Sequence, residues 1–306
     1  MSYIKPSSVK PGDTLAIVAP SAALAEDTAE KGLAFLRSLG YQLKLGRSVT
    51  AHDGYLAGTD DLRAQDINDA FADDSVQGII CLRGGYGATR LLPLLDYETI
   101  AAQPKLFVGF SDITALHTVF LQRCGFSLIH GTMVMSLGRN ASDYTKTQFA
   151  YGLTHPFTAH TLVLPENCQL ETLVPGDVTG PLVGGNMMLI SALTGTPYAL
   201  QADGAILALE EVGEEAYALD RMLCQFEESG LIEKIKGLAF GEFYHCGPDE
   251  PADYEWTVKD VITYYAKKWH KPAIWGLPFG HGADNTWLPL GQNVRLNASE
   301  PSLTFL

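Results

Sequence analysis

The stretch LFVGFSDITALHTVFLQRCGF, residues 106–126, decides the fold, because it joins a buried strand to an amphipathic helix through a short polar pair. The apolar run at 105–110 predicts the strand, and the apolar spacing over 112–125 predicts the helix. Ser111 falls at the junction, so we expect its side chain at the carboxyl edge of a sheet. Ligands of open parallel α/β sheets bind at that edge.

The same order of strand and helix repeats through the first half of the chain. The strands are continuous runs of Val, Ile and Leu, which indicates burial on both faces. Such alternation predicts a mainly parallel sheet flanked by helices and joined by right-handed crossovers. Strands are predicted at 14–20, 41–46, 76–85 and 105–110, and helices at 25–40, 60–73, 88–102 and 112–125.

The second half differs in character and opens with Gly- and Pro-rich short strands at 169–186. Before it, residues 141–170 are polar with only short apolar runs. We therefore expect an α/β protein of two domains. Residues 1–140 form the N-terminal α/β domain, 141–170 form the interdomain connection, and 171–306 form a smaller C-terminal α/β domain with short strands.

Composition places the chain among ordinary globular proteins. It has 306 residues, of which 46% are hydrophobic and 18% charged, enough for one large core or two moderate ones. The net charge of −14 argues against nucleic-acid binding and against affinity for anionic lipid. The first 20 residues lack the pattern of a secretory signal, and no apolar run is long enough to span a bilayer. We expect a cytoplasmic protein without a membrane partner.

The cysteines and histidines give no sign of a metal site. The five cysteines are odd in number and widely scattered, which indicates reduced thiols rather than disulfides or a zinc site. Neither an H-E-x-x-H motif nor a clustered histidine pair is present, so no metal is expected. The cysteines are Cys81, Cys124, Cys168, Cys224 and Cys246.

Ser111 is a candidate nucleophile because of its position between strand and helix. The start of a helix supplies unpaired backbone N–H groups and a partial positive charge, which can hold an oxyanion after attack on a carbonyl. The N–H of Asp112 is the natural donor. The alternative is a plain N-cap, since serine is favoured there and GFSD is not the G-x-S-x-G nucleophile elbow.

A glycine-rich turn, RGGYGATR at 83–90, follows another predicted strand. Its three glycines let the backbone approach a ligand closely. A dinucleotide-binding loop is one alternative, but Arg90 stands where the third glycine of that fingerprint belongs. A backbone N–H of Gly84 or Gly85 would serve as a second oxyanion donor, with Arg83 or Arg90 available for a substrate carboxylate. A tight turn with solvated arginines is the other alternative.

An acidic pair, Glu210 and Glu211, ends the strand predicted at 204–211. A carboxylate at this edge can hold and orient an imidazole. Strict alternation lets only one of the two face inwards, and periodicity does not choose between them. The alternative is the start of a solvated loop.

His281 lies between two glycines directly after an apolar strand, on an accessible and turning backbone. It is the best candidate for a general base among the eight histidines. With Ser111 and one acid of the pair it gives the order Ser, Glu, His on strand ends. This combination, supported by a glycine-rich turn, indicates nucleophilic catalysis.

Seven segments carry a resemblance to a known family. Together, and in this order, they resemble the LD-carboxypeptidases, cytosolic serine peptidases also called muramoyltetrapeptide carboxypeptidases. The resemblance runs nearly end to end. The segments are PGDTLAIVAPS (11–21), RGGYGATRLLPLLDY (83–97), FVGFSDITALH (107–117), HGTM (130–133), GPLVGGNMMLI (180–190), LALEEVGEEAYALDRML (207–223) and GLPFGHG (276–282).

The resemblance implies a catalytic triad of Ser111, Glu210 and His281, which resolves the choice within the acidic pair. It also implies an oxyanion hole formed by the backbone N–H groups of Asp112 and of the glycine-rich turn, where Gly85 is our choice. The implied architecture is a pair of α/β domains, commonly in a homodimer. The implied chemistry needs no metal and no organic cofactor.

The implied reaction is hydrolysis of the bond between the L-centre of a diamino acid and the terminal D-alanine of murein tetrapeptide, in cell-wall recycling. Arg83, from its charge and position, is a candidate for binding the terminal carboxylate. A sister group in the family cleaves peptidyl or aminoacyl nucleotide toxins and gives self-immunity; it tends to lack the RGGYG turn, which is intact here. The alternative from another class is a non-catalytic binder of a small peptide or nucleotide.

Overall fold

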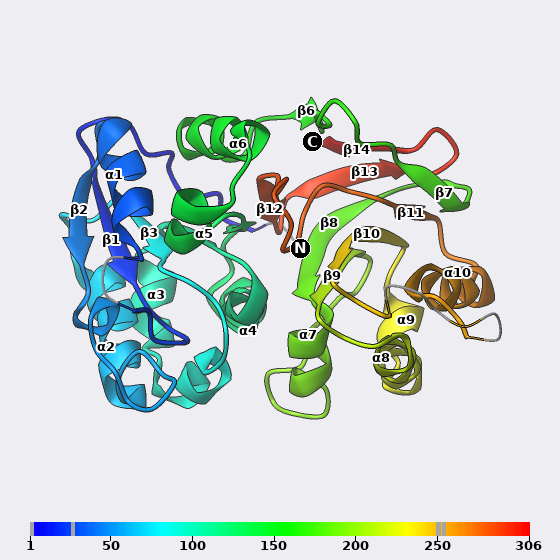
Figure 1. The fold of residues 1–306 in the computed structure, drawn as a ribbon, viewed down its shortest axis with the longest axis horizontal. Coiled ribbons are helices and arrows are strands. Elements are labelled where there is room, and N and C mark those ends of the chain that lie inside the picture. The colour runs from blue at the N-terminus through cyan, green and yellow to red at the C-terminus, as the bar shows by residue number, and fades with distance from the viewer. Residues whose placement is uncertain (1–2, 26–27, 249–251, 253–254) are drawn as a thin grey trace. The chain divides into compact units, whose positions relative to one another are not determined.

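The computed structural model describes residues 3–25, 28–248, 252 and 255–306. The chain forms two compact units, each built around its own sheet (Figure 1). Unit 1 comprises Met1–Phe157 and Asn285–Gly291, and unit 2 comprises Thr158–Asp284 and Gln292–Leu306.

The sheet of unit 1 is mainly parallel, as the alternating pattern predicts. Its strands follow the order β12–β5–β4–β3–β1–β2. The five strands from the first half of the chain are parallel to one another, and only β12, from the far end of the chain, is antiparallel to its neighbour β5. The strands are β1 (Thr14–Val18), β2 (Gln42–Leu45), β3 (Gly78–Cys81), β4 (Leu106–Gly109), β5 (Leu128–His130) and β12 (Leu288–Leu290).

Helices cover both faces of this sheet because its strands are apolar on both sides. On one face Leu15 of β1 belongs to a buried cluster that includes Leu33 of α1 and Leu137 of α5. On the other face Phe107 of β4 stacks on Phe71 of α2, with 6.0 Å between ring centroids. The helices are α1 (Glu30–Ser38), α2 (Asp60–Ala72), α3 (Tyr97–Ala102), α4 (Thr114–Val119), α5 (Val134–Arg139) and α6 (Asp143–Thr154).

The sheet of unit 2 is mixed, with the order β6–β14–β13–β8–β9–β10–β11–β7. Strands β8, β9, β10 and β11 are parallel, and the outer strands are antiparallel to their neighbours. The strands are β6 (His160–Thr161), β7 (Glu171–Val174), β8 (Asp177–Asn186), β9 (Ile206–Val212), β10 (Gly237–Tyr244), β11 (Ala273–Trp275), β13 (Asn293–Asn297) and β14 (Ser302–Phe305). Helices gather on one side of this sheet (Figure 1): α7 (Met187–Leu193), α8 (Ala216–Glu228), α9 (Leu231–Lys234) and α10 (Val258–Trp269).

The two-domain α/β fold class is confirmed, and several element predictions need correction. The strands of unit 2 are not all short, since β8 has 10 residues and β10 has 8. The helix predicted at 88–102 is broken, because Pro93 lies in a 3₁₀ helix that ends at Leu94 and Asp96 then caps α3. The polar stretch 141–170 contains α6, which Ser142 caps.

Two further helix predictions differ in detail. Helix α1 is shorter than the predicted 25–40, of which residues 26–27 lie outside the described residues. The helix predicted at 112–125 is a succession of three kinds of turn: a 3₁₀ turn at Ser111–Ile113, then α4, then a π-helical turn at Phe120–Cys124. Gly125 ends the succession in the left-handed region, with φ of 74°.

None of the described helices combines the length and the apolar character that crossing a bilayer requires.

Candidate active site

Ser111 lies on a sharp and strained turn. Strand β4 ends at Gly109, and Ser111 begins the 3₁₀ turn with φ of 63°. A side-chain-bearing residue in this left-handed region costs on the order of 1–3 kcal/mol, and such strain is concentrated at functional sites. A Cβ atom on Gly109 would lie 2.7 Å from Cγ2 of Ile113, so the turn requires glycine there. The turn has the sharp, strained strand-to-helix geometry that is also found in nucleophile elbows, although the G-x-S-x-G motif is absent.

The backbone before α4 forms a short 3₁₀ turn that begins at Ser111. Phe110 occupies the N-cap position of the turn, so Ser111 is not the N-cap that the alternative interpretation supposed. The hydrogen-bonded turn starts with the N–H of Ile113, which donates to the carbonyl of Phe110 at 3.3 Å. The N–H of Asp112 precedes this bond, in the part of a helix whose N–H groups lack intrahelical acceptors.

The glycine-rich turn lies directly beside Ser111. A Cβ atom on Gly84 would lie 3.0 Å from both Cβ and Oγ of Ser111. Gly85 has φ of 115°, and a Cβ atom there would lie 2.7 Å from Cβ of Ala22. Gly85 therefore requires glycine for space and conformation, and a side chain at Gly84 would crowd the side chain of Ser111. Gly84 is buried and Gly85 is exposed.

The two arginines of this turn are engaged with nearby groups. Arg83 donates from Nη1 to the carbonyl of Ala23 at 3.0 Å and from Nε to its neighbour Gly84 at 3.2 Å. Burial and the charge of Arg139 lower the pKa of Arg83. Arg90 is exposed and forms an ion pair with Asp60 at 2.8 Å. Arg83 thus attaches the glycine-rich turn to the loop that contains Ala23. Of the two arginines, Arg83 is the one bonded to Gly84, which lies against Ser111.

The side chain of Asp112 holds the glycine-rich turn in place. Its Oδ2 accepts a hydrogen bond from Oγ of Ser21 at 2.5 Å and another from the N–H of Ala88 at 2.8 Å. Both Asp112 and Ser21 are buried. Burial raises the pKa of Asp112, although these donors and the charge of Arg63 oppose the shift. Asp112 thus links the turn that carries Ser111 to two loops.

Arg63 supports the same turn from the other side. Its side chain is fully buried, and Nη1 donates to the carbonyl of Gly87 at 3.0 Å and also bonds to the carbonyl of Pro20. Asp60 pairs with its Nη2. A buried guanidinium that bonds to several carbonyls at once fixes the relative positions of the loops that carry them.

In unit 2, the buried Glu210 forms a hydrogen-bonded pair with the partly buried His281. Oε2 of Glu210, on β9, lies 2.7 Å from Nδ1 of His281, which follows β11. The Glu210 side chain is 0% exposed and the His281 side chain 18% exposed. Burial alone lowers the pKa of His281, but the charge and hydrogen bond of Glu210, with the charges of Glu211 and Glu242, outweigh it and raise that pKa.

Glu211 points elsewhere, as the alternation of a strand requires. Its carboxylate accepts hydrogen bonds from Nδ2 of Asn186 and from the N–H of Met188, both at 2.7 Å, at the start of α7. Burial and the charge of Glu210 raise the pKa of Glu211 to about 7, against the effect of these donors. Within the acidic pair, Glu210 therefore faces the imidazole and Glu211 caps a helix.

The structure thus groups the predicted site residues within their own units. Ser111, Asp112, Gly85 and Arg83 gather in unit 1, and Glu210 and His281 pair in unit 2.

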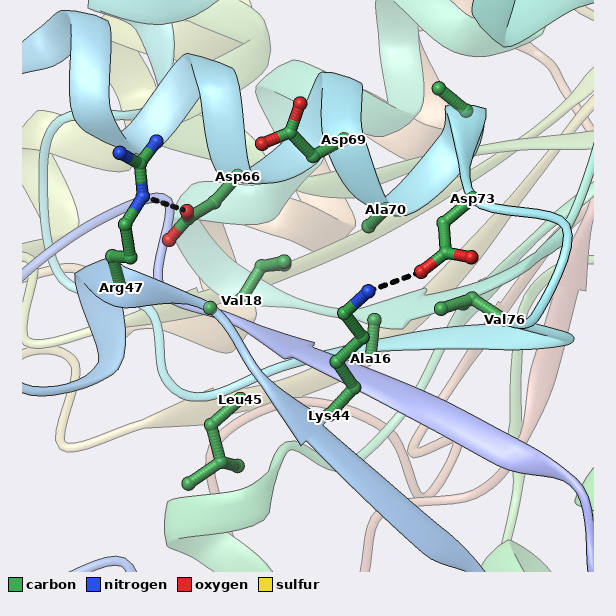
Figure 2. A pocket seen from close by; sticks show the side chains of 12 residues that line it. Ala16, Val18, Lys44, Leu45, Arg47, Asp66, Asp69, Ala70, Asp73 and Val76 are labelled. Atoms are coloured by element: carbon green, nitrogen blue, oxygen red, sulfur yellow. Dashed lines mark hydrogen bonds and ion pairs between the residues drawn. The ribbon is translucent and has the colours of Figure 1, made fainter.

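A separate cavity of about 520 Å³ lies in unit 1 between β2 and α2 (Figure 2). Lys44 pairs with Asp73 there, and Arg47 lies 3.6 Å from Asp66. The residues that Figure 2 draws include none of the predicted site residues.

Sequence reasoning missed two supports of the turn that carries Ser111. For Arg63 a signal exists, because it occupies the same face of α2 as the buried Ile67 and Ala70, where a charged residue is unusual. The side chain of Asp112 gives no comparable signal, since an acid in the first helical turn is ordinary.

Comparisons with known proteins agree over most of the chain. A family profile described as "LD-carboxypeptidase N-terminal domain" matches residues 15–131, and one described as "LD-carboxypeptidase C-terminal domain" matches residues 179–296. The "Probable murein peptide carboxypeptidase" of Bacillus subtilis is 33% identical, over 97% of this chain and 92% of its own. The "Murein tetrapeptide carboxypeptidase" of Pseudomonas aeruginosa is 35% identical, over 93% of each chain.

A solved structure shows the same fold. The muramoyltetrapeptide carboxypeptidase from Oxalobacter formigenes superposes with a TM-score of 0.83 at 30% identity, covering 95% of this chain and 97% of that chain.

Proposed function

Because the chain belongs to the LD-carboxypeptidase family, we propose that it is a serine peptidase that releases the terminal D-alanine of murein tetrapeptide. The observation that carries the proposal is the strained conformation of Ser111 at a strand–helix junction, with the backbone of Gly84 against its hydroxyl. Full-length relatives named for murein peptides support this substrate over the nucleotide-linked toxins of the sister group.

In the first step Oγ of Ser111 attacks the carbonyl carbon of the L,D-peptide bond, and Nε2 of His281 takes the hydroxyl proton. Glu210 is bonded to Nδ1 of the same ring, which leaves Nε2 as the basic nitrogen. Its charge stabilises the imidazolium that forms.

The tetrahedral intermediate carries a negative oxygen, for which the N–H groups of Asp112 and Gly85 are the proposed donors. The exposure of Gly85, against the burial of Gly84, supports this choice. His281 then gives its proton to the leaving amine of D-alanine, and an acyl-enzyme remains on Ser111. Water, activated by the same histidine, hydrolyses the ester and frees the tripeptide.

Arg83 is the proposed partner of the terminal carboxylate. Two of its nitrogens are bonded to backbone carbonyls, and its Nη2 lies 3.7 Å from the place a Cβ atom on Gly85 would take. Its positive charge is therefore held on the turn itself, which suits recognition of a chain end.

We further propose a cytoplasmic homodimer that binds neither nucleic acid nor membrane. All five cysteines are free thiols, which supports a reducing compartment, and the net charge of −14 supports the lack of affinity for polyanions. The dimer follows from the family resemblance and is tested by light scattering after gel filtration.

The deciding experiment incubates the purified protein with murein tetrapeptide and measures free D-alanine by mass spectrometry. Ser111→Ala removes the nucleophile, and Ser38→Ala, at an exposed helix position, is the matched control. Release by the wild type and by Ser38→Ala, but not by Ser111→Ala, supports the proposal. No release from a folded wild-type protein contradicts it, and hydrolysis of an aminoacyl sulfamoyl adenylate would then favour the sister-group activity.

A further inference from the structure

We propose that Glu242 is a positioning residue that fixes the backbone on both sides of His281 and adds a negative charge to the surroundings of its imidazole. The inference rests on the proposed function, in which His281 is the general base. Glu242 lies on β10, next to the strand that carries Glu210, and all the groups involved belong to unit 2.

Two hydrogen bonds from Glu242 bracket His281. Its main-chain N–H donates to the carbonyl of Phe279 at 2.9 Å, two residues before the histidine. Its carboxylate accepts from the N–H of Gly282 at 2.7 Å, one residue after it. The segment 279–282 is therefore attached to a single residue at both ends, and the orientation of the histidine Cα–Cβ bond follows from that attachment.

The glycines beside His281 exist because this packing is so close. A Cβ atom on Gly282 would lie 2.1 Å from Oε2 of Glu242. A Cβ atom on Gly280 would lie 3.2 Å from Cβ of Glu242 and 3.3 Å from Oε2 of Glu210, and its φ of 139° already disfavours a side chain. The two glycines of the G-H-G pattern thus leave room for two carboxylates to approach one histidine.

The two carboxylates divide the task. Glu210 contacts the ring at Nδ1, which fixes the rotation and the tautomer of the imidazole. Glu242 contacts the backbone beside His281, which fixes the position of the histidine Cα and Cβ atoms. A misplacement of about 1 Å in a catalytic group can cost on the order of 10²-fold in rate, so both kinds of restraint affect turnover.

The irregular pairing of β10 with β9 gives Glu242 this reach. The register shifts between Phe240 and Phe243, so Glu242 lies within the irregular stretch. A Cβ atom on Gly241 would lie 2.4 Å from the carbonyl of Phe279, which shows how closely the strand meets the histidine segment. Such bulges redirect side chains near functional sites.

The charge of Glu242 also acts on the imidazole. Burial raises the pKa of Glu242, while the charge of His281 opposes that shift. The acids that face this pair are Glu210, Glu211 and Asp284. Removal of the Glu242 charge therefore makes the imidazolium easier to deprotonate, even where the backbone bond to Gly282 is kept.

The test separates the two effects with two variants. Glu242→Gln keeps an acceptor for the N–H of Gly282 but removes the charge, and Glu242→Ala removes both. For Glu242→Gln we expect the acid limb of the pH profile of kcat/KM and the NMR titration of His281 to move to lower pH. For Glu242→Ala we expect kcat to fall by about 10²-fold with KM nearly unchanged, and Glu242→Gln to restore most of it.

Asp177→Asn is the matched control, because Asp177 is an exposed acid of the same unit, paired with Arg295. An unchanged His281 titration in Glu242→Gln, or a wild-type kcat in Glu242→Ala, overturns the inference. If Glu242→Ala does not fold, the titration in Glu242→Gln decides alone. A wild-type protein that releases no D-alanine contradicts the proposed function, whereas the NMR titration still tests the contact between Glu242 and His281.

Discussion

A Cβ atom on Gly84 would lie 3.0 Å from Oγ of Ser111. The main chain of the glycine-rich turn therefore lies directly against the hydroxyl of Ser111. A side chain at position 84 would crowd that hydroxyl. The carboxylate of Asp112 holds the turn in this position through Ala88. Gly84 therefore provides space for the serine side chain and not flexibility, since buried hydrogen bonds fix the turn around it.

Gly84→Ala should lower kcat/KM by about 10²-fold, because the new methyl group displaces either the serine side chain or the turn that supplies the oxyanion donor. The free energy of unfolding should change little, because φ of Gly84 lies outside the positive range and alanine can adopt this backbone conformation. The measurement is D-alanine release together with urea denaturation. Gly12→Ala is the control: its φ is 98° and a Cβ atom there meets nothing within 4 Å, so it should lose about 1 kcal/mol and keep its activity. Equal activity in both variants contradicts the proposed contact.

The pH dependence of the wild type should carry the signature of Glu210. In the proposed mechanism the neutral form of His281 is the base. Interactions in the folded protein raise the pKa of His281 above the ordinary value of 6.5. Activity therefore decreases as pH falls through that raised pKa, so the acid limb should lie above pH 6.5. Steady-state kinetics at constant ionic strength check this, with kcat/KM extrapolated at each pH.

Glu210→Gln should move this limb to lower pH, because the main source of the raised pKa is removed. It should also reduce kcat by about 10³–10⁴-fold, since the tautomer of His281 is no longer fixed. A limb that stays at the wild-type position in Glu210→Gln would show that another group controls it.

Much of the fold follows from periodicity, because the first half alternates continuous apolar strands with amphipathic helices. The failures have local causes. Residues 141–170 look like a connection, yet α6 forms there because Phe149 and Leu153 complete the core of unit 1. Strand β12 also joins the sheet of unit 1, although it comes from the far end of the chain. Local sequence patterns do not predict such a long-range pairing of Leu288 with His130.

The candidate site shows the same division. Ser111 and His281 can be found in the sequence. Ser111 directly follows a predicted strand, and His281 lies between two glycines, where little local packing explains a histidine. Periodicity cannot choose Glu210 over Glu211, since both are buried; the family resemblance implies Glu210, and the structure shows that its carboxylate faces His281. Glu242 is harder still, because a register shift in β10 directs it.

Ser21→Ala tests the support of the nucleophile turn from unit 1. The variant removes the hydroxyl that donates to buried Asp112, and a buried acceptor that loses its donor costs about 1–3 kcal/mol. We expect that loss in urea denaturation and a fall of about tenfold in kcat/KM as the turn loosens. Ser38→Ala, whose exposed hydroxyl bonds to the carbonyl of Phe35, should change stability by less than about 0.5 kcal/mol and leave activity unchanged. Loss of stability without loss of activity would show that the bond to Asp112 only holds the fold together.

His117 on α4 should make the folded state sensitive to acid. It is fully buried, its ring centroid lies 5.8 Å from that of Phe107, and neither ring nitrogen has a hydrogen-bond partner among the described residues. Burial lowers the pKa of His117 from 6.5 to about 3. Between these two values the unfolded chain binds a proton at this residue that the folded protein does not bind. The free energy of unfolding is therefore unaffected by His117 above pH 6.5 and decreases as pH falls below it.

The expected slope from this residue is about 1.4 kcal/mol per pH unit. Urea denaturation of the wild type and of His117→Leu at several values between about pH 5 and pH 6.5 isolates this contribution as the difference between the two slopes. The difference is needed because Glu211 and His281, whose pKa values are raised in the folded protein, also titrate in this range. His117→Leu should reduce the slope by one proton and raise stability at neutral pH, since two unpaired buried nitrogens are removed. His52→Leu, at an exposed position, is the control and should keep the wild-type slope. A slope that is the same in His117→Leu and in the wild type would mean that another group takes up the proton on unfolding.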